Sequence, residues 1–128
     1  MTAILDTHTL IWAGQAQHRL SPTARAVFSD PDNVFLVSAA TAWEIATKVR
    51  LGKLPEATAL EANFVAIVAG AGYKLVPVTA EDALNAGRMA GAHRDPWDRM
   101  IAAQALALDI PVISIDPKLD GFGVRRLW

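Results

Sequence analysis

The chain has 128 residues and a formal net charge of −1 at pH 7, with 52% hydrophobic and 20% charged residues. This length and composition predict one globular domain, residues 1–128, and exclude a largely disordered chain. The sequence contains no cysteine, which excludes disulfides, thiolate metal sites and cysteine nucleophiles.

Short apolar runs alternate with helical patterns along the whole chain. In chain order we expect a strand at 2–5, a helix directly after Asp6, a helix that opens at Ser21-Pro22 and ends near Asp30, a strand at 34–37, helices at about 40–51 and 57–69, a strand at 73–76, a helix at 79–91, a helix that opens at Asp95-Pro96, and strands at 111–115 and 124–127. Strands that alternate with helices imply a parallel sheet covered on both faces.

The first residues, Met1–Asp6, lack the basic segment of a secretory signal. The longest uncharged stretches are far shorter than the ~20 residues that a membrane-spanning helix needs. The sequence therefore predicts a soluble, cytoplasmic protein without membrane contact.

Four acidic residues lie in apolar segments, where burial of an ionised carboxylate costs free energy. Asp6 and Asp116 close two apolar strands, Asp98 lies in the first turn of an almost wholly apolar helix, and Glu44 lies in a helix with little other charge. Ligands bind at the carboxyl ends of strands in open parallel sheets, where Asp6 and Asp116 stand. We therefore expect the four acids to converge.

Each acid also has a local explanation. Asp98 can favour the helix dipole, Glu44 can pair with Lys48 one turn later, Asp116 can start a turn, and Asp6 can cap the following helix. Asp95, next to Pro96, is predicted as a helix N-cap. Four acids at one end of one sheet would each need a separate local explanation. A single cation site explains all four together.

An all-oxygen ligand set favours Mg²⁺ or Mn²⁺. His8, His18 and His93 are scattered and do not have the spacing of a zinc site. Setting aside the four acids changes the net charge from −1 to −1 + 4 = +3, so the charge does not exclude a nucleic-acid substrate. The basic residues then available include Lys48, Arg50, Lys53, Arg94, Arg99, Lys118, Arg125 and Arg126.

Four segments carry a resemblance to a known family. They are LDTHTLIW at 5–12, SAATAWEIATK at 38–48, HRDPWDRMIAAQA at 93–105, and ISIDP at 113–117 with the ending through Trp128. The chain thereby resembles the PIN-domain proteins of the VapC class, the ribonuclease toxins of bacterial toxin–antitoxin pairs. Two substitutions depart from the usual pattern: Trp97 replaces a phenylalanine, and Ser114 replaces a threonine.

The resemblance implies a three-layer α/β/α sandwich around a mainly parallel sheet of four to five strands. It also implies a Mg²⁺-dependent endoribonuclease, with Mn²⁺ able to substitute, a cognate small antitoxin and a homodimer. The catalytic and metal-binding residues that it implies are Asp6, Glu44, Asp98 and Asp116.

The substrate predicted from this chemistry is single-stranded or looped RNA. We expect Arg94, Arg99 and Lys48 to hold its phosphates, and the hydroxyls of Thr7 and Ser114 to lie beside the acids as further substrate-binding groups. An antitoxin would pair a basic side chain with the acids and cover apolar surface around Trp12 and Trp43.

Two other interpretations remain open. Asp6 could be the nucleophile of a small phosphohydrolase, although that design usually has a second acid two residues later, where this chain has His8. Alternatively, the chain is a non-catalytic module that acts by binding a protein. An intact set of four acids favours the ribonuclease.

Overall fold

The computed structural model describes residues 1–91 and 93–128 and contains a five-stranded sheet whose neighbouring strands are all parallel. The strands, in the spatial order β3-β2-β1-β4-β5, are β1 (Thr2–Leu5), β2 (Val34–Ser38), β3 (Lys74–Val76), β4 (Val112–Ile113) and β5 (Arg126–Leu127). The helices are α1 (Thr7–Gln15), α2 (Pro22–Ser29), α3 (Ala39–Arg50), α4 (Thr58–Ala62), α5 (Phe64–Gly70), α6 (Ala80–Arg88) and α7 (Pro96–Leu108), with 3-10 turns η1 (Gln17–Arg19), η2 (Pro55–Ala57) and η3 (Pro117–Phe122).

Strand β1 is the centre of the sheet. It pairs with β2 on one side and with β4 on the other, in a register that sets Leu5 beside Ile113. A strand between two others and between two layers of helices must be apolar on both faces. Accordingly, Ala3, Ile4 and Leu5 are fully buried.

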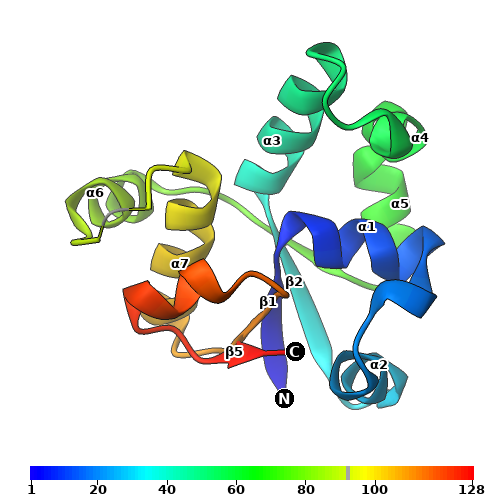
Figure 1. The fold of residues 1–128 in the computed structure, drawn as a ribbon, viewed down its shortest axis with the longest axis horizontal. Helices are drawn as coiled ribbons and strands as arrows, with labels where there is room; N and C mark the ends of the chain where they lie inside the picture. Colours follow the sequence, from blue (N-terminus) through cyan, green and yellow to red (C-terminus); the bar gives the residue numbers. More distant parts are fainter. Residues whose placement is uncertain (92) are drawn as a thin grey trace.

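Helices cover both faces of the sheet, so the predicted three-layer α/β/α architecture is confirmed. Ala3 and Leu5 point into a core shared with α1, α2, α3, α4 and α5, whereas Ile4 points into a second core formed mainly by α7 and η3. Figure 1 shows α6 and α7 on the left of the central strands and α1, α4 and α5 on the right.

The prediction of one helix over residues 57–69 is wrong. The structure has η2, α4 and α5 there, with a break at Asn63, whose backbone lies outside the helical region at φ −134° and ψ 35°. Asparagine is a weak helix former. Leu60 and Phe64 are both buried on either side of the break, so tertiary packing sets the direction of α5.

The last two strands are shorter than expected, at Val112–Ile113 and Arg126–Leu127. Pro111 has no N–H to donate to a ladder, and the chain leaves the sheet after Ile113 to bring Ser114 towards Asp6. Within the described residues, no helix is both long enough and apolar enough to cross a membrane.

Candidate metal centre

Asp6 lies directly after β1 and serves as the N-cap of α1. Its Oδ1 accepts the backbone N–H of Thr9 at 2.8 Å, and its Oδ2 accepts the hydroxyl of Ser114. The side-chain hydroxyl of Thr9 donates to the carbonyl of Ile113 at 2.8 Å, which fixes α1 against β4. The carboxylate is therefore buried, 7% exposed, and held in one orientation.

Asp116 reaches the same end of the sheet from β4. The Ser114 hydroxyl that donates to Asp6 also accepts the backbone N–H of Asp116 at 3.0 Å, so one serine connects the two acidic residues. The Oδ1 of Asp116 accepts the backbone N–H of Lys118 at 2.9 Å and caps η3. Both acids thus lie at the point between β1 and β4 where the strand order reverses, the usual ligand site of such sheets.

Glu44 projects from α3 and is also buried. Its Oε1 accepts the hydroxyl of Thr7, and its Oε2 lies 2.5 Å from the Nζ of Lys48. Burial disfavours the charged ammonium, but Glu44, Asp95 and Asp98 together outweigh it and raise the pKa of Lys48. The helical ion pair considered from the sequence is therefore present, between buried Glu44 and a lysine that also feels the half-buried Asp95 and Asp98.

Asp98 lies in the first turn of α7, after the N-cap Asp95. The Oδ1 of Asp95 accepts the backbone N–H groups of Trp97 at 2.9 Å and Asp98 at 3.1 Å, which confirms the predicted cap. Burial raises the pKa of Asp98 to about 6 against the hydrogen bond with His93, and Asp95 and Glu44 add to the rise. A cation bound near Asp98 would offset the repulsion that Asp95 and Glu44 exert on its carboxylate.

Three side chains come close enough to share one ion. His93, Asp98 and Asp116 each offer a ligand atom, and the three atoms lie within 4.8 Å of one another. Within residues 1–91 and 93–128 this is the one such group of three. Asp6 and Glu44 lie outside it.

His93 is the residue that sequence reasoning missed. Its Nε2 lies 2.6 Å from the Oδ2 of Asp98. The scattered spacing of the three histidines gives no indication of this contact. The signal available in the sequence was its position five residues before Asp98, beyond the Asp95-Pro96 helix start. Spacing alone does not reveal the contact, because the path of the connection between α6 and α7 decides it.

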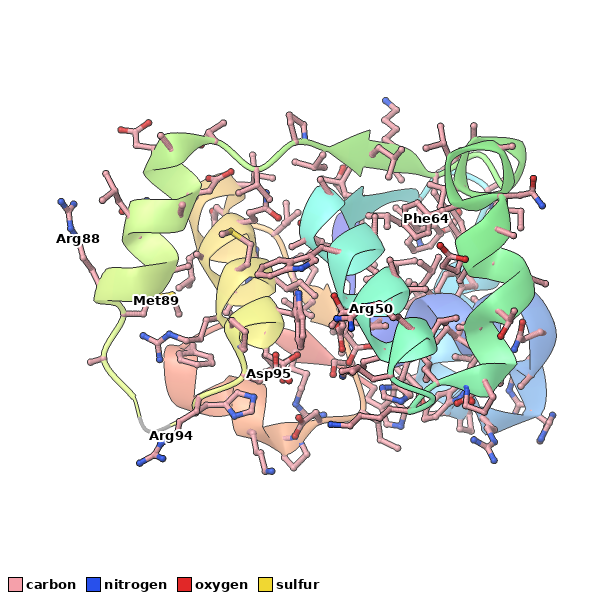
Figure 2. All side chains as sticks on the ribbon, turned by 90° about the horizontal axis from the view of Figure 1, so that it is seen from above. Arg50, Phe64, Arg88, Met89, Arg94 and Asp95 are labelled. Atoms are coloured by element: carbon pink, nitrogen blue, oxygen red, sulfur yellow. The ribbon has the colours of Figure 1, made fainter. Side chains whose placement is uncertain are left out.

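The predicted phosphate-binding residues lie in different environments. Figure 2 shows Arg94 projecting outward from the connection between α6 and α7, and its side chain is exposed. The guanidinium of Arg99 instead donates to three backbone carbonyls: Ala86 at 2.9 Å, His93 at 3.1 Å and Met89. Arg99 thus stabilises the connection that carries His93.

Replacing Arg99 with lysine is expected to lower the free energy of unfolding by about 2 kcal/mol, because one ammonium cannot serve three carbonyls and hydrogen bonds to charged groups contribute about 1.5–3 kcal/mol each. Urea unfolding followed by circular dichroism measures the loss. Arg125→Lys is the matched control: its pair with Asp109 is exposed, and a change below about 0.5 kcal/mol is expected. Equal losses in the two variants would contradict this role for Arg99.

An apolar groove of about 430 Å³ lies beside the centre, between α3, α6 and α7. Trp43 and Trp97 line it, with ring centroids 5.3 Å apart and ring planes at 70°. Trp43 is 61% exposed. Trp12, by contrast, is half-buried and packs against Trp128 at 6.0 Å, so Trp43 is the more accessible of the two tryptophans singled out from the sequence.

Comparison with solved structures gives the same fold across nearly the whole chain. VapC20 of Mycobacterium tuberculosis, described as a sarcin-ricin loop cleaving toxin, is 20% identical, with a TM-score of 0.68 over 97% of this chain and 96% of that one. VapBC2 of Rickettsia felis, bound to a DNA fragment from its promoter, is 14% identical, with a TM-score of 0.67 over 98% and 97%. VapBC-1 of nontypeable Haemophilus influenzae is 20% identical, with a TM-score of 0.65 over 98% and 96%.

None of the curated proteins matches the sequence. The sequence profile of the PIN domain, however, matches residues 3–123, from β1 through η3. The match includes all four predicted acids, and the fold agrees with it. This chain belongs to the PIN-domain family.

Proposed function

We propose that this chain is a metal-dependent endoribonuclease that hydrolyses RNA phosphodiester bonds and is the toxin of a toxin–antitoxin pair. The observation that carries the proposal is the approach of one ligand atom each of Asp98, on α7, and Asp116, at the start of η3, to within 4.8 Å of each other and of His93. Family membership and the fold shared with VapC toxins support the same activity.

The donor set fits a divalent cation. We assign Asp6, Asp98 and Asp116 to metal binding, and Glu44 to binding directly, through water, or as a general base. Carboxylate oxygens suit Mg²⁺ and Mn²⁺. A bound divalent ion at this position would offset charge on the phosphoryl oxygens and lower the pKa of an attacking water.

The hydroxyls of Thr7 and Ser114 donate to Glu44 and Asp6. The sequence predicts these two hydroxyls as substrate-binding groups. We propose instead that they orient the acids. Arg94 and Lys48 remain our candidates for holding phosphates, since Arg94 is exposed and Lys48 lies beside Glu44. For Arg99 the predicted phosphate contact is less favoured, because its donors already serve backbone carbonyls.

The Asp-nucleophile alternative is less favoured because Asp6 lacks the second acid that this design usually has two residues later. The two hydrogen bonds that Asp6 accepts leave a lone pair on each oxygen, so they are compatible with metal binding. The position two residues later holds His8, which is exposed and whose ring lies tilted beside Trp12, with centroids 5.5 Å apart. The metal-dependent reaction needs no covalent intermediate on Asp6.

We further propose a small cognate antitoxin, a homodimer and a cytoplasmic location. Structures of VapBC complexes share this fold, and the exposed Trp43 beside the apolar groove provides hydrophobic contact area near the acids. A basic side chain of the antitoxin, most simply arginine, would pair with Asp98 or Asp116 and compete with the metal.

The test is cleavage of RNA by purified, antitoxin-free protein. We expect excess EDTA to abolish cleavage, and added Mg²⁺ or Mn²⁺ to restore it, because the acids repel a phosphodiester unless a cation is present. Gel analysis of a labelled RNA substrate measures both steps. Full cleavage in excess chelator, with metal absent by elemental analysis, would refute the metal-dependent reaction.

A further inference from the structure

We infer that His93 is itself a ligand of the divalent ion, so that the centre binds through nitrogen as well as oxygen and favours Mn²⁺ over Mg²⁺. This inference rests on the proposed function, because it concerns the same ion. It adds a residue outside the four acids and assigns the centre a metal preference.

The positions of the three side chains suit one shared ion. Ligand atoms about 2.1 Å from an octahedral ion lie about 3 to 4 Å apart, and the atoms of His93, Asp98 and Asp116 all lie within 4.8 Å of one another. The Nε2 of His93 is 2.6 Å from the Oδ2 of Asp98, a hydrogen-bond distance. An entering ion would take the place of the hydrogen bond between these two atoms.

Two further contacts hold His93 in its position beside Asp98. Its carbonyl accepts a hydrogen bond from Arg99 at 3.1 Å, and its ring packs against Phe122 with centroids 5.9 Å apart. Gly91 has φ +127°, and a Cβ there would lie 3.2 Å from the Phe122 ring. Glycine therefore lets the connection lie directly on Phe122.

The element that supports His93 also carries an acid of the centre. Turn η3 follows Asp116 and ends at Phe122, so the residue that packs on the imidazole and the second carboxylate belong to one element. A hollow of about 420 Å³, lined by His93, Lys118 and Phe122 among others, provides an approach to the ring.

The competing explanation is that His93 only pairs with Asp98 and leaves when metal binds. The two explanations predict opposite results. Loss of a ligand weakens metal binding, whereas loss of a competing partner leaves it unchanged or strengthens it. The identity of the ion separates them further, because Mn²⁺ tolerates a nitrogen ligand better than Mg²⁺, which dehydrates reluctantly and is bound through water and carboxylate oxygens.

The experiment compares His93→Gln with wild type by isothermal titration calorimetry, using MnCl₂ and MgCl₂ separately on the purified full chain. We expect the Mn²⁺ affinity to fall by about tenfold or more, while the Mg²⁺ affinity changes far less. The matched control is His18→Gln, because His18 is exposed on η1, and it should leave both affinities unchanged. Equal or tighter Mn²⁺ binding by a folded His93→Gln variant would overturn the inference.

Pulsed electron paramagnetic resonance of the Mn²⁺-loaded wild type gives a second readout that needs no variant. We expect nuclear modulation from a directly bound imidazole nitrogen, and a change in its frequency when the histidines carry ¹⁵N. Mn²⁺ binding without any histidine signal would overturn the role of His93 and leave the proposed function standing. Failure of wild type to bind either ion would overturn the proposed function itself, and His93 as a ligand with it.

Discussion

Asp98→Asn is expected to reduce metal-dependent RNA cleavage by about a hundredfold or more, because removing one charged ligand weakens the interactions that stabilise the transition state by several kcal/mol. Asparagine keeps the size of the side chain and can still accept a hydrogen bond at the start of α7. The fold should therefore persist, as circular dichroism would show. Cleavage at the wild-type rate would refute the assignment of Asp98.

The same variant should also change how stability depends on pH. In the metal-free protein the pKa of Asp98 is raised from 3.8 to about 6, so the folded state binds this proton more tightly than the unfolded chain does. The tighter binding of this proton adds to the free energy of unfolding below about pH 4, and this contribution is lost as the pH rises through about 6. Thermal unfolding without metal should show Asp98→Asn more stable than wild type at pH 7.5, with the difference largely gone at pH 4.

Expression of the wild-type chain alone in a bacterial host is expected to stop growth, whereas Asp6→Asn should permit it. A ribonuclease without its antitoxin degrades the RNA of the cell that makes it. Asparagine can still accept the N–H of Thr9 as an N-cap, so the variant removes the charge and retains the helix start. Growth curves and colony counts after induction measure the effect.

Asp109→Asn is the control for this growth experiment. Asp109 is exposed at the end of α7 with φ +52°, a conformation that asparagine tolerates well. It should be as toxic as wild type. Normal growth with wild-type protein, at a level where soluble protein is confirmed, would count heavily against the toxin assignment.

Much of the fold follows from local patterns in the sequence. Buried parallel strands read as continuous apolar runs, and the helix starts at Ser21, Thr79 and Asp95 each have the side-chain cap that the sequence predicts. Asp6 and Asp116 reach the same end of the sheet because each follows one of two neighbouring parallel strands, β1 and β4. The strands and helix starts depend on few residues at short spacing, whereas the placing of the two acids depends on the order of the strands in the sheet.

The features that the sequence did not reveal depend on tertiary packing. Nothing in the periodicity of residues 57–69 shows that the chain turns at Asn63 to bury Phe64. The charge of Arg99 suggested a phosphate ligand, whereas the folded connection surrounds its guanidinium with carbonyls. The contact between His93 and Asp98 likewise depends on how the folded chain places His93, and not on the spacing of the two residues. In each case the partner is set by the path of a connection.

The hydrogen bond from Ser114 to Asp6 joins residues 108 positions apart, and that from Thr9 to Ile113 joins residues 104 apart. Contacts between such distant positions form late, because the entropy of closing a long loop must be overcome first. During synthesis, a nascent chain can present β1, α1 and α3 while it still lacks β4 and both later acids. If the proposed function holds, the metal centre would be complete only once β4 has paired with β1, and a chain that still lacks β4 would lack it.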